Sequence, residues 1–84
     1  MNVESDRKEA FKIGLVPVDQ LYIGFVCVWF YDGKKMSDVI IKSPIVGEYG
    51  KERIRIDHIL ENDKTREGGY VNINELYEIN KYLI

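Results

Sequence analysis

The stretch Gln20–Tyr31, QLYIGFVCVWFY, decides how this 84-residue chain folds. Its twelve residues carry no charge, and Asp32-Gly33 follows at once. β-Branched and aromatic residues favour a strand, and Asp-Gly is the signal of a two-residue hairpin turn. The stretch is apolar on both of its faces, whereas an antiparallel strand commonly buries one. We therefore expect a long hairpin strand over residues 21–31 with a large apolar surface.

The second strand of this hairpin is expected over residues 35–42. It ends before Ser43-Pro44, because proline cannot donate a hydrogen bond to a ladder. A two-residue turn at Asp32-Gly33 also sets the register of the hairpin, and it places Trp29 opposite Met36.

Two further strands are expected after the hairpin. In residues 51–60, KERIRIDHIL, apolar and charged residues alternate with the period of a half-buried strand. Residues 61–69 are mostly charged and polar, end in two glycines, and are predicted to form a loop. Residues 70–73 are expected to form a short fourth strand.

Helices are predicted at both ends of the chain. Ser5 can cap a short helix that runs to about Lys12. Near the other end, Asn72 and Glu75 have the spacing of a capping box, which predicts a helix after them. Three apolar residues then recur on one stripe of that helix: Leu76, Ile79 and Leu83.

These elements predict one α+β domain over residues 1–84. Its antiparallel sheet has about four strands, and the C-terminal helix packs on one face of the sheet. The sequence leaves open which face the helix covers. A small half-open β-barrel is the alternative, because a long strand with two apolar faces is also typical of a tightly curled sheet.

The composition is typical of a folded domain, with 45% hydrophobic residues and a net charge of −2. It lacks the basic excess of a dedicated DNA-binding domain. The N-terminus has no signal-peptide pattern, and the uncharged stretch is shorter than the roughly 20 residues that a membrane-spanning helix needs. A single cysteine, Cys27, favours a reducing compartment. We therefore expect a cytoplasmic protein.

Residues that carry chemistry are scarce in this chain. His58 is the only histidine, and in a strand it points away from Glu61, so the two cannot share a metal ion. Cys27 lies between two valines, without the neighbouring base and positive charge that activate a thiolate. We expect no catalytic residue, no metal site and no cofactor, and therefore no enzyme.

The aromatic residues are the remaining candidates for function. Two short helices cannot cover both faces of the long strand, and an uncovered apolar patch commonly marks an interface in which Trp and Tyr contribute strongly. We expect a small non-catalytic protein-binding module, such as an inhibitor, an adaptor or a small subunit carried by a mobile element. Its partner is another protein or a second copy of this chain, as a homodimer. The expected interface residues are Phe25, Trp29, Tyr31, Met36 and Tyr70.

The alternative function is the binding of single-stranded nucleic acid by a small β-barrel. Cations spaced two residues apart along a strand can follow a phosphate backbone, and tyrosines can stack on bases. Glu52 and Asp57 interrupt the stripe of cations in this chain. The expected contact residues are Tyr49, Lys51, Arg53 and Arg55.

Overall fold

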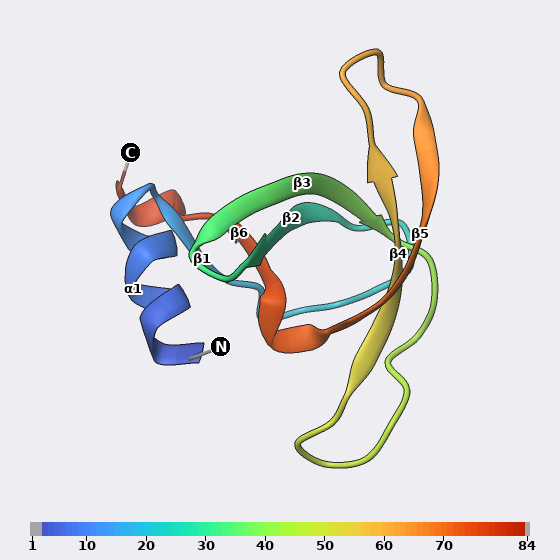
Figure 1. Cartoon of the computed structure of the whole chain (residues 1–84), viewed down its shortest axis with the longest axis horizontal. Coiled ribbons are helices and arrows are strands. Elements are labelled where there is room, and N and C mark those ends of the chain that lie inside the picture. The colour runs from blue at the N-terminus through green and yellow to red at the C-terminus, as the bar shows by residue number, and fades with distance from the viewer. Residues whose placement is uncertain (1–2, 84) are drawn as a thin grey trace.

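A computed structural model describes residues 3–83 of the chain. These residues form an N-terminal α-helix and a six-stranded antiparallel sheet with the strand order β1-β6-β2-β3-β4-β5 (Figure 1). The elements are α1 (Val3–Lys12), β1 (Leu15–Pro17), β2 (Val26–Tyr31), β3 (Lys34–Ile41), β4 (Arg53–Ile59), β5 (Thr65–Asn72) and β6 (Leu76–Ile79). Two short 3-10 turns are η1 (Ile73–Glu75) and η2 (Lys81–Leu83).

The β2–β3 hairpin confirms the turn predicted from Asp32-Gly33. Both residues have a positive φ, 51° and 80°, as a type I′ turn requires. The strand β2 is shorter than expected and begins at Val26, because the chain turns just before it. Gly24 has a φ of 93°, and the N–H of Phe25 donates to the carbonyl of Tyr22.

A β-bulge changes the register within this hairpin. Phe30 pairs with Lys35 as the turn predicts, but Trp29 pairs with Ser37 and not with Met36, so that predicted pair is wrong. A one-residue shift reverses the facing of every later side chain on the strand. The bulge therefore pairs Cys27 with Val39 instead of Asp38, and both apolar side chains enter the same core.

The two faces of the sheet carry separate cores, and β2 contributes to both. Cys27 and Trp29 point to one face, which we call the inner face, whereas Val28 and Phe30 point to the outer face. This division explains why the sequence of β2 is apolar on both sides. The inner core consists of Cys27, Val39, Ile41, Ile54, Ile56 and Leu76.

The inner core is closed by the bending of the sheet and by the segment between β1 and β2. Figure 1 shows β3 curving away from the α1 side of the molecule toward the β4–β5 hairpin, which crosses it steeply. Val18, Leu21 and Phe25 of the connecting segment pack against the inner core. As a result, central residues such as Val39 and Ile41 have no exposed surface.

The helix α1 lies on the outer face and confirms the predicted N-terminal helix. Asp6 on this helix is buried and accepts a hydrogen bond from the backbone N–H of Asp32 at 3.1 Å. This contact ties α1 to the β2–β3 turn. The outer core consists of Ala10, Leu15, Val28, Phe30 and Tyr77.

The predicted C-terminal helix is wrong. Within residues 3–83, the chain after β5 forms the turn η1 and then the strand β6, which pairs with both β1 and β2. Leu76 and Tyr77 are fully buried in the inner and outer cores, an alternation that a strand provides. Glu75 does not complete a capping box, since its carboxylate accepts hydrogen bonds from the indole of Trp29 and the amide of Asn72. Long-range contacts have overridden the local helix signal.

The predicted count of four strands is also wrong, because β1 and β6 join the sheet. The α+β class and the antiparallel pairing are confirmed. Among the described residues the ladder begins at β1 and ends at β5, so an open sheet with two edges replaces both predicted architectures.

The β4–β5 hairpin is longer than the sequence indicates. β4 confirms the strand predicted over residues 51–60, but β5 begins at Thr65, inside the segment predicted to be a loop. The register shifts between Arg55 and Asp57, opposite the two glycines of β5. Gly68 is required there, since a Cβ atom on it would lie 2.5 Å from the backbone oxygen of Ile56.

Candidate functional site

The five residues predicted to form an interface do not lie together. Phe25 and Trp29 are half-buried against the inner core. Tyr31 and Met36 are exposed near the turn of the β2–β3 hairpin, and the Tyr31 ring lies 6.1 Å from the Trp29 ring. Tyr70 is exposed on the outer face of β5, because the next residue packs inward. The set is therefore divided among the inner core, the hairpin turn and the outer face.

A polar cluster on the inner face holds Trp29 in place. Its indole N–H donates to Oε1 of the buried Glu75 at 3.1 Å, and its ring lies 5.7 Å from the ring of His58. The amide of Asn72 donates to the other carboxylate oxygen of Glu75 at 3.0 Å. Trp29 is thus fixed by contacts from β4 and from the end of η1.

His58 forms the one pair in this region that resembles a catalytic arrangement. Its Nδ1 is hydrogen-bonded to the hydroxyl of Ser37 at 2.9 Å, which is the nucleophile–base half of a triad. The other ring nitrogen faces Gly68, where a Cβ atom would lie 3.2 Å from Nε2. With Trp29 on one side and Gly68 on another, the pair is a structural link between β3 and β4.

Cys27 does not have the setting of a nucleophile. Burial, assisted by the negative charge of Glu78, raises the pKa of its thiol to about 12. A thiol with this pKa stays protonated at neutral pH, and the thiolate is the reactive form. Cys27 acts as a small apolar residue of the inner core.

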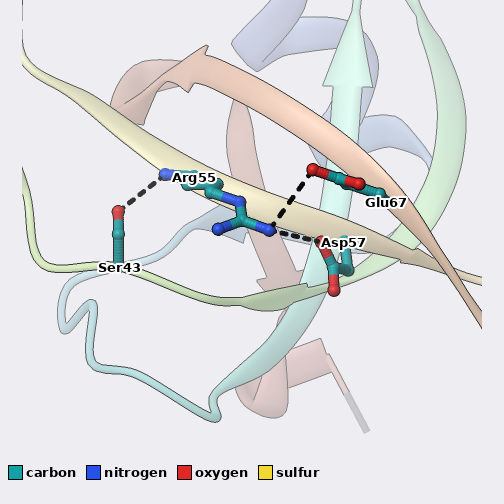
Figure 2. A network of polar contacts seen from close by, with 4 residues as sticks. All are labelled: Ser43, Arg55, Asp57 and Glu67. Atoms are coloured by element: carbon teal, nitrogen blue, oxygen red, sulfur yellow. Dashed lines mark hydrogen bonds and ion pairs between the residues drawn. The ribbon is translucent and has the colours of Figure 1, made fainter.

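The cations predicted to contact nucleic acid are partly neutralised by carboxylates. Figure 2 shows the guanidinium of Arg55 directed at Asp57 and Glu67, at 3.9 and 3.7 Å. The backbone N–H of Arg55 also donates to the hydroxyl of Ser43 at 2.9 Å. Tyr49 is fully exposed.

The remaining three residues of that set lie before this network along the chain. Lys51 and Arg53 are exposed on either side of Glu52, whose carboxylate accepts a hydrogen bond from the N–H of Gly50 at 2.6 Å. Acidic groups thus lie beside the stripe at both of its ends. This charge pattern does not favour a phosphate backbone as the ligand.

An apolar depression lies on the outer face where β2 and β6 separate. β6 pairs with β2 only at Val28 and Trp29, so the earlier residues of β2 have no partner on that side among the described residues. The resulting space has a volume of about 370 Å³. We call it the outer depression. Its outer side is lined by Val26, Val28, Asp38, Ile79 and Lys81, and Phe25, Cys27 and Glu78 line it from the inner side of the sheet.

The helix α1 covers only the neighbouring part of the outer face. Val28 is buried in the outer core, whereas Val26 is 54% exposed and Ile79 is 64% exposed. Two large apolar residues therefore flank an open depression beside a well-packed core.

Comparisons with known proteins gave no match to this chain among protein-family models, curated proteins or solved structures. In residues 3–83, no three His, Cys, Asp or Glu side chains are grouped so as to hold a metal ion. The same residues contain no helix of the length and apolar character that a membrane span requires.

The sequence did not indicate the outer depression as a site. Ile79 is predicted on the buried stripe of a helix, and Val26 is predicted within a strand without a distinct role. A signal was available in Leu76–Ile79, LYEI, because β-branched and aromatic residues favour a strand over a helix. The capping-box spacing just before it pointed the other way.

Proposed function

We propose that this protein is a small non-catalytic module that binds a partner protein through the outer depression. The observation that carries the proposal is the exposure of Val26 and Ile79 on a sheet face of which α1 covers the adjoining part. Single exposed apolar residues are normal on a protein surface. Here two of them border the same cavity, whose floor is the buried Val28.

The shape and charge of the depression fit a protein side chain. Its volume of about 370 Å³ is large enough to admit an apolar side chain of a partner. Two carboxylates, Asp38 and Glu78, and one cation, Lys81, belong to its lining, and Asp38 also contacts Lys35 at 3.2 Å. An apolar centre with a polar rim is the common anatomy of a protein interface.

The partner is a second copy of this chain or another protein, and one experiment tells the two apart. The variant Ile79→Asp places a charge in the depression, and Ile23→Asp makes the same change at a residue that is 61% exposed in the segment before β2. Analytical ultracentrifugation over a concentration series measures self-association. Competition between each variant and the wild type for proteins captured from the native lysate measures foreign partners.

We expect Ile79→Asp to lose either the dimer or the captured protein, whereas Ile23→Asp keeps it. If Ile79→Asp, wild type and Ile23→Asp behave alike in both measurements, the outer depression is not the binding surface. Amide chemical shifts of both variants establish beforehand that the fold is retained.

A further inference from the structure

A second apolar groove lies between α1 and the edge strand β1. It has a volume of about 480 Å³ and shares no lining residue with the outer depression. Its lining residues are Arg7, Lys8, Phe11 and Lys12 from α1, and Leu15, Val16 and Pro17 from β1.

The helical residues of this groove share one face of α1. Positions four apart on a helix are neighbours, so Arg7 lies next to Phe11 and Lys8 next to Lys12. Asp6 and Ala10 on the adjoining face are buried against the sheet, which directs the basic face toward β1. Phe11 is half-exposed and forms an apolar wall of the groove.

The other wall is the backbone of an edge strand. The carbonyl of Gly14 and the N–H of Val18 both bond to the β6 side of the sheet. In an antiparallel ladder alternate residues direct their N–H and C=O groups to the same neighbour. The backbone N–H and C=O groups of Leu15 and the carbonyl of Pro17 therefore point away from β6, toward the free edge of the sheet. Pro17 has no N–H, so the edge can pair with only a short added strand.

The charge at the groove differs in sign from that of the whole chain. Arg7, Lys8 and Lys12 surround an apolar floor, whereas the chain has a net charge of −2. Lys12 contacts Glu9 at 3.0 Å, but both side chains are exposed, so this pair is weak. The groove is thus complementary to a ligand that has both apolar and acidic groups.

We propose that the α1–β1 groove binds a short, extended, acidic segment of a partner protein. The segment pairs with the free edge of β1 at Leu15, in the manner of strand addition, and places an apolar side chain against Phe11. Its carboxylates lie near the three cations of α1. A nucleic-acid backbone satisfies the cations but not the strand edge or the apolar floor, so the geometry favours a peptide.

The test uses short synthetic peptides with blocked ends and the ¹⁵N-labelled protein. The probe alternates Glu and Val, and the control peptide alternates Lys and Val. We expect the Glu-Val peptide to shift the amide signals of residues 7–17, with a large change at the Leu15 N–H. The Lys-Val peptide should bind about tenfold more weakly or not at all, because its charges oppose those of the rim.

A pair of matched variants separates the groove from general charge effects. Lys8→Gln/Lys12→Gln removes two charges at the groove, and Lys34→Gln/Lys64→Gln removes two exposed charges at the hairpin turns. We expect the first variant to bind the Glu-Val peptide about fivefold more weakly with less dependence on salt, and the second to bind like wild type. Both variants should keep the remaining amide spectrum, as expected if they retain the fold.

The inference is overturned if the Glu-Val peptide causes no shifts, or causes them outside residues 7–17. It is also overturned if a short oligothymidylate shifts the same residues with equal affinity, because the cations alone then determine binding. The outcome is independent of the outer depression: Val26→Asp, at a residue that pairs with Ile40 on β3 and not with β1, should leave peptide binding unchanged.

Discussion

The inner and outer faces of the sheet use the same strand in two different ways. On the inner face, β2 contributes to a core that β4, β5, β6 and the segment before β2 enclose, and residues such as Val39 and Ile54 have no exposed surface. On the outer face, Val28 and Phe30 are buried by α1, whereas Val26 in the same strand is more than half exposed.

The enclosed residues of the two cores stabilise the fold, whereas the exposed residues of the outer face are the candidates for binding. The inner core and the part of the outer face under α1 hold the buried apolar side chains. Val26 and Ile79 at the outer depression are exposed and thus contribute little to folding. Substitutions on the two faces should therefore have different consequences.

The largest effect is expected in the inner core. Ile41→Ala removes a fully buried side chain and should lower the free energy of unfolding by about 2–5 kcal/mol, because a cavity remains. Ile79→Ala on the outer face should change it by less than about 0.5 kcal/mol. Urea denaturation monitored by circular dichroism measures both, and equal effects would contradict the assignment of the two faces.

The bulge in the β4–β5 hairpin is the next most sensitive place. Gly68→Ala puts a Cβ atom 2.5 Å from the backbone oxygen of Ile56, whereas a Cβ on Gly69 meets no atom within 4 Å. We expect Gly68→Ala to destabilise the protein by about 1–3 kcal/mol, as overpacking does. Gly69→Ala, the matched control, should leave stability unchanged or slightly raised. Thermal unfolding compares the stability of the two variants. If Gly68→Ala is as stable as the wild type, the bulge is not where the structure has it.

The hydrogen bonds of Glu75 should contribute a smaller amount. Glu75→Gln replaces one of two accepting oxygens with an amide, so the indole of Trp29 or the amide of Asn72 loses its acceptor. We expect a loss of about 1 kcal/mol and a change in Trp29 fluorescence. The exposed Glu61→Gln serves as the control, and it should alter neither quantity. An unchanged Trp29 spectrum in Glu75→Gln would show that this bond is not formed.

The smallest effect is expected at the outer depression itself. Val26→Thr adds a hydroxyl to an exposed side chain and should change stability by less than about 0.5 kcal/mol. Val28→Thr makes the same change two residues later, where the side chain is buried, and should cost about 1–3 kcal/mol for an unsatisfied hydroxyl. Chemical denaturation of the pair compares them within one strand, and a large loss in Val26→Thr would mean that Val26 is covered.

The parts of the fold that the sequence predicts are those set by local chemistry. Asp32-Gly33 forms its turn because both residues accept a positive φ. The alternation in β4 is visible because one face is apolar and the other charged. The bulge beside Trp29 could not be predicted, since it depends on which face of β3 must be buried.

The C-terminal segment shows how a local signal fails. The spacing of Asn72 and Glu75 is that of a helix cap, but Trp29, 46 residues away from Glu75, takes the carboxylate. The strand predicted over residues 70–73 covers only the end of β5. The first part of β5 was missed for the opposite reason, because Thr65–Glu67 shows no apolar alternation.

The outer depression could not be predicted because the sequence did not show how the sheet curves or that β6 belongs to it. The sequence correctly indicated an apolar strand with more surface than two helices cover, but it could not show that the face of Trp29 is enclosed by the curved sheet. The outer depression forms where β2 and β6 separate. Because the sequence did not predict β6, it could not predict this depression. The exposed residue Ile79 was therefore assigned to a buried stripe.

Methyl NMR with a soluble paramagnetic probe measures whether the inner face is closed and the outer depression is open in the free protein. We expect strong broadening of the methyl signals of Val26 and Ile79, and protection of those of Val28, Val39 and Ile41. Protection of Val26 and Ile79 to the same degree as Val39 would contradict this expectation.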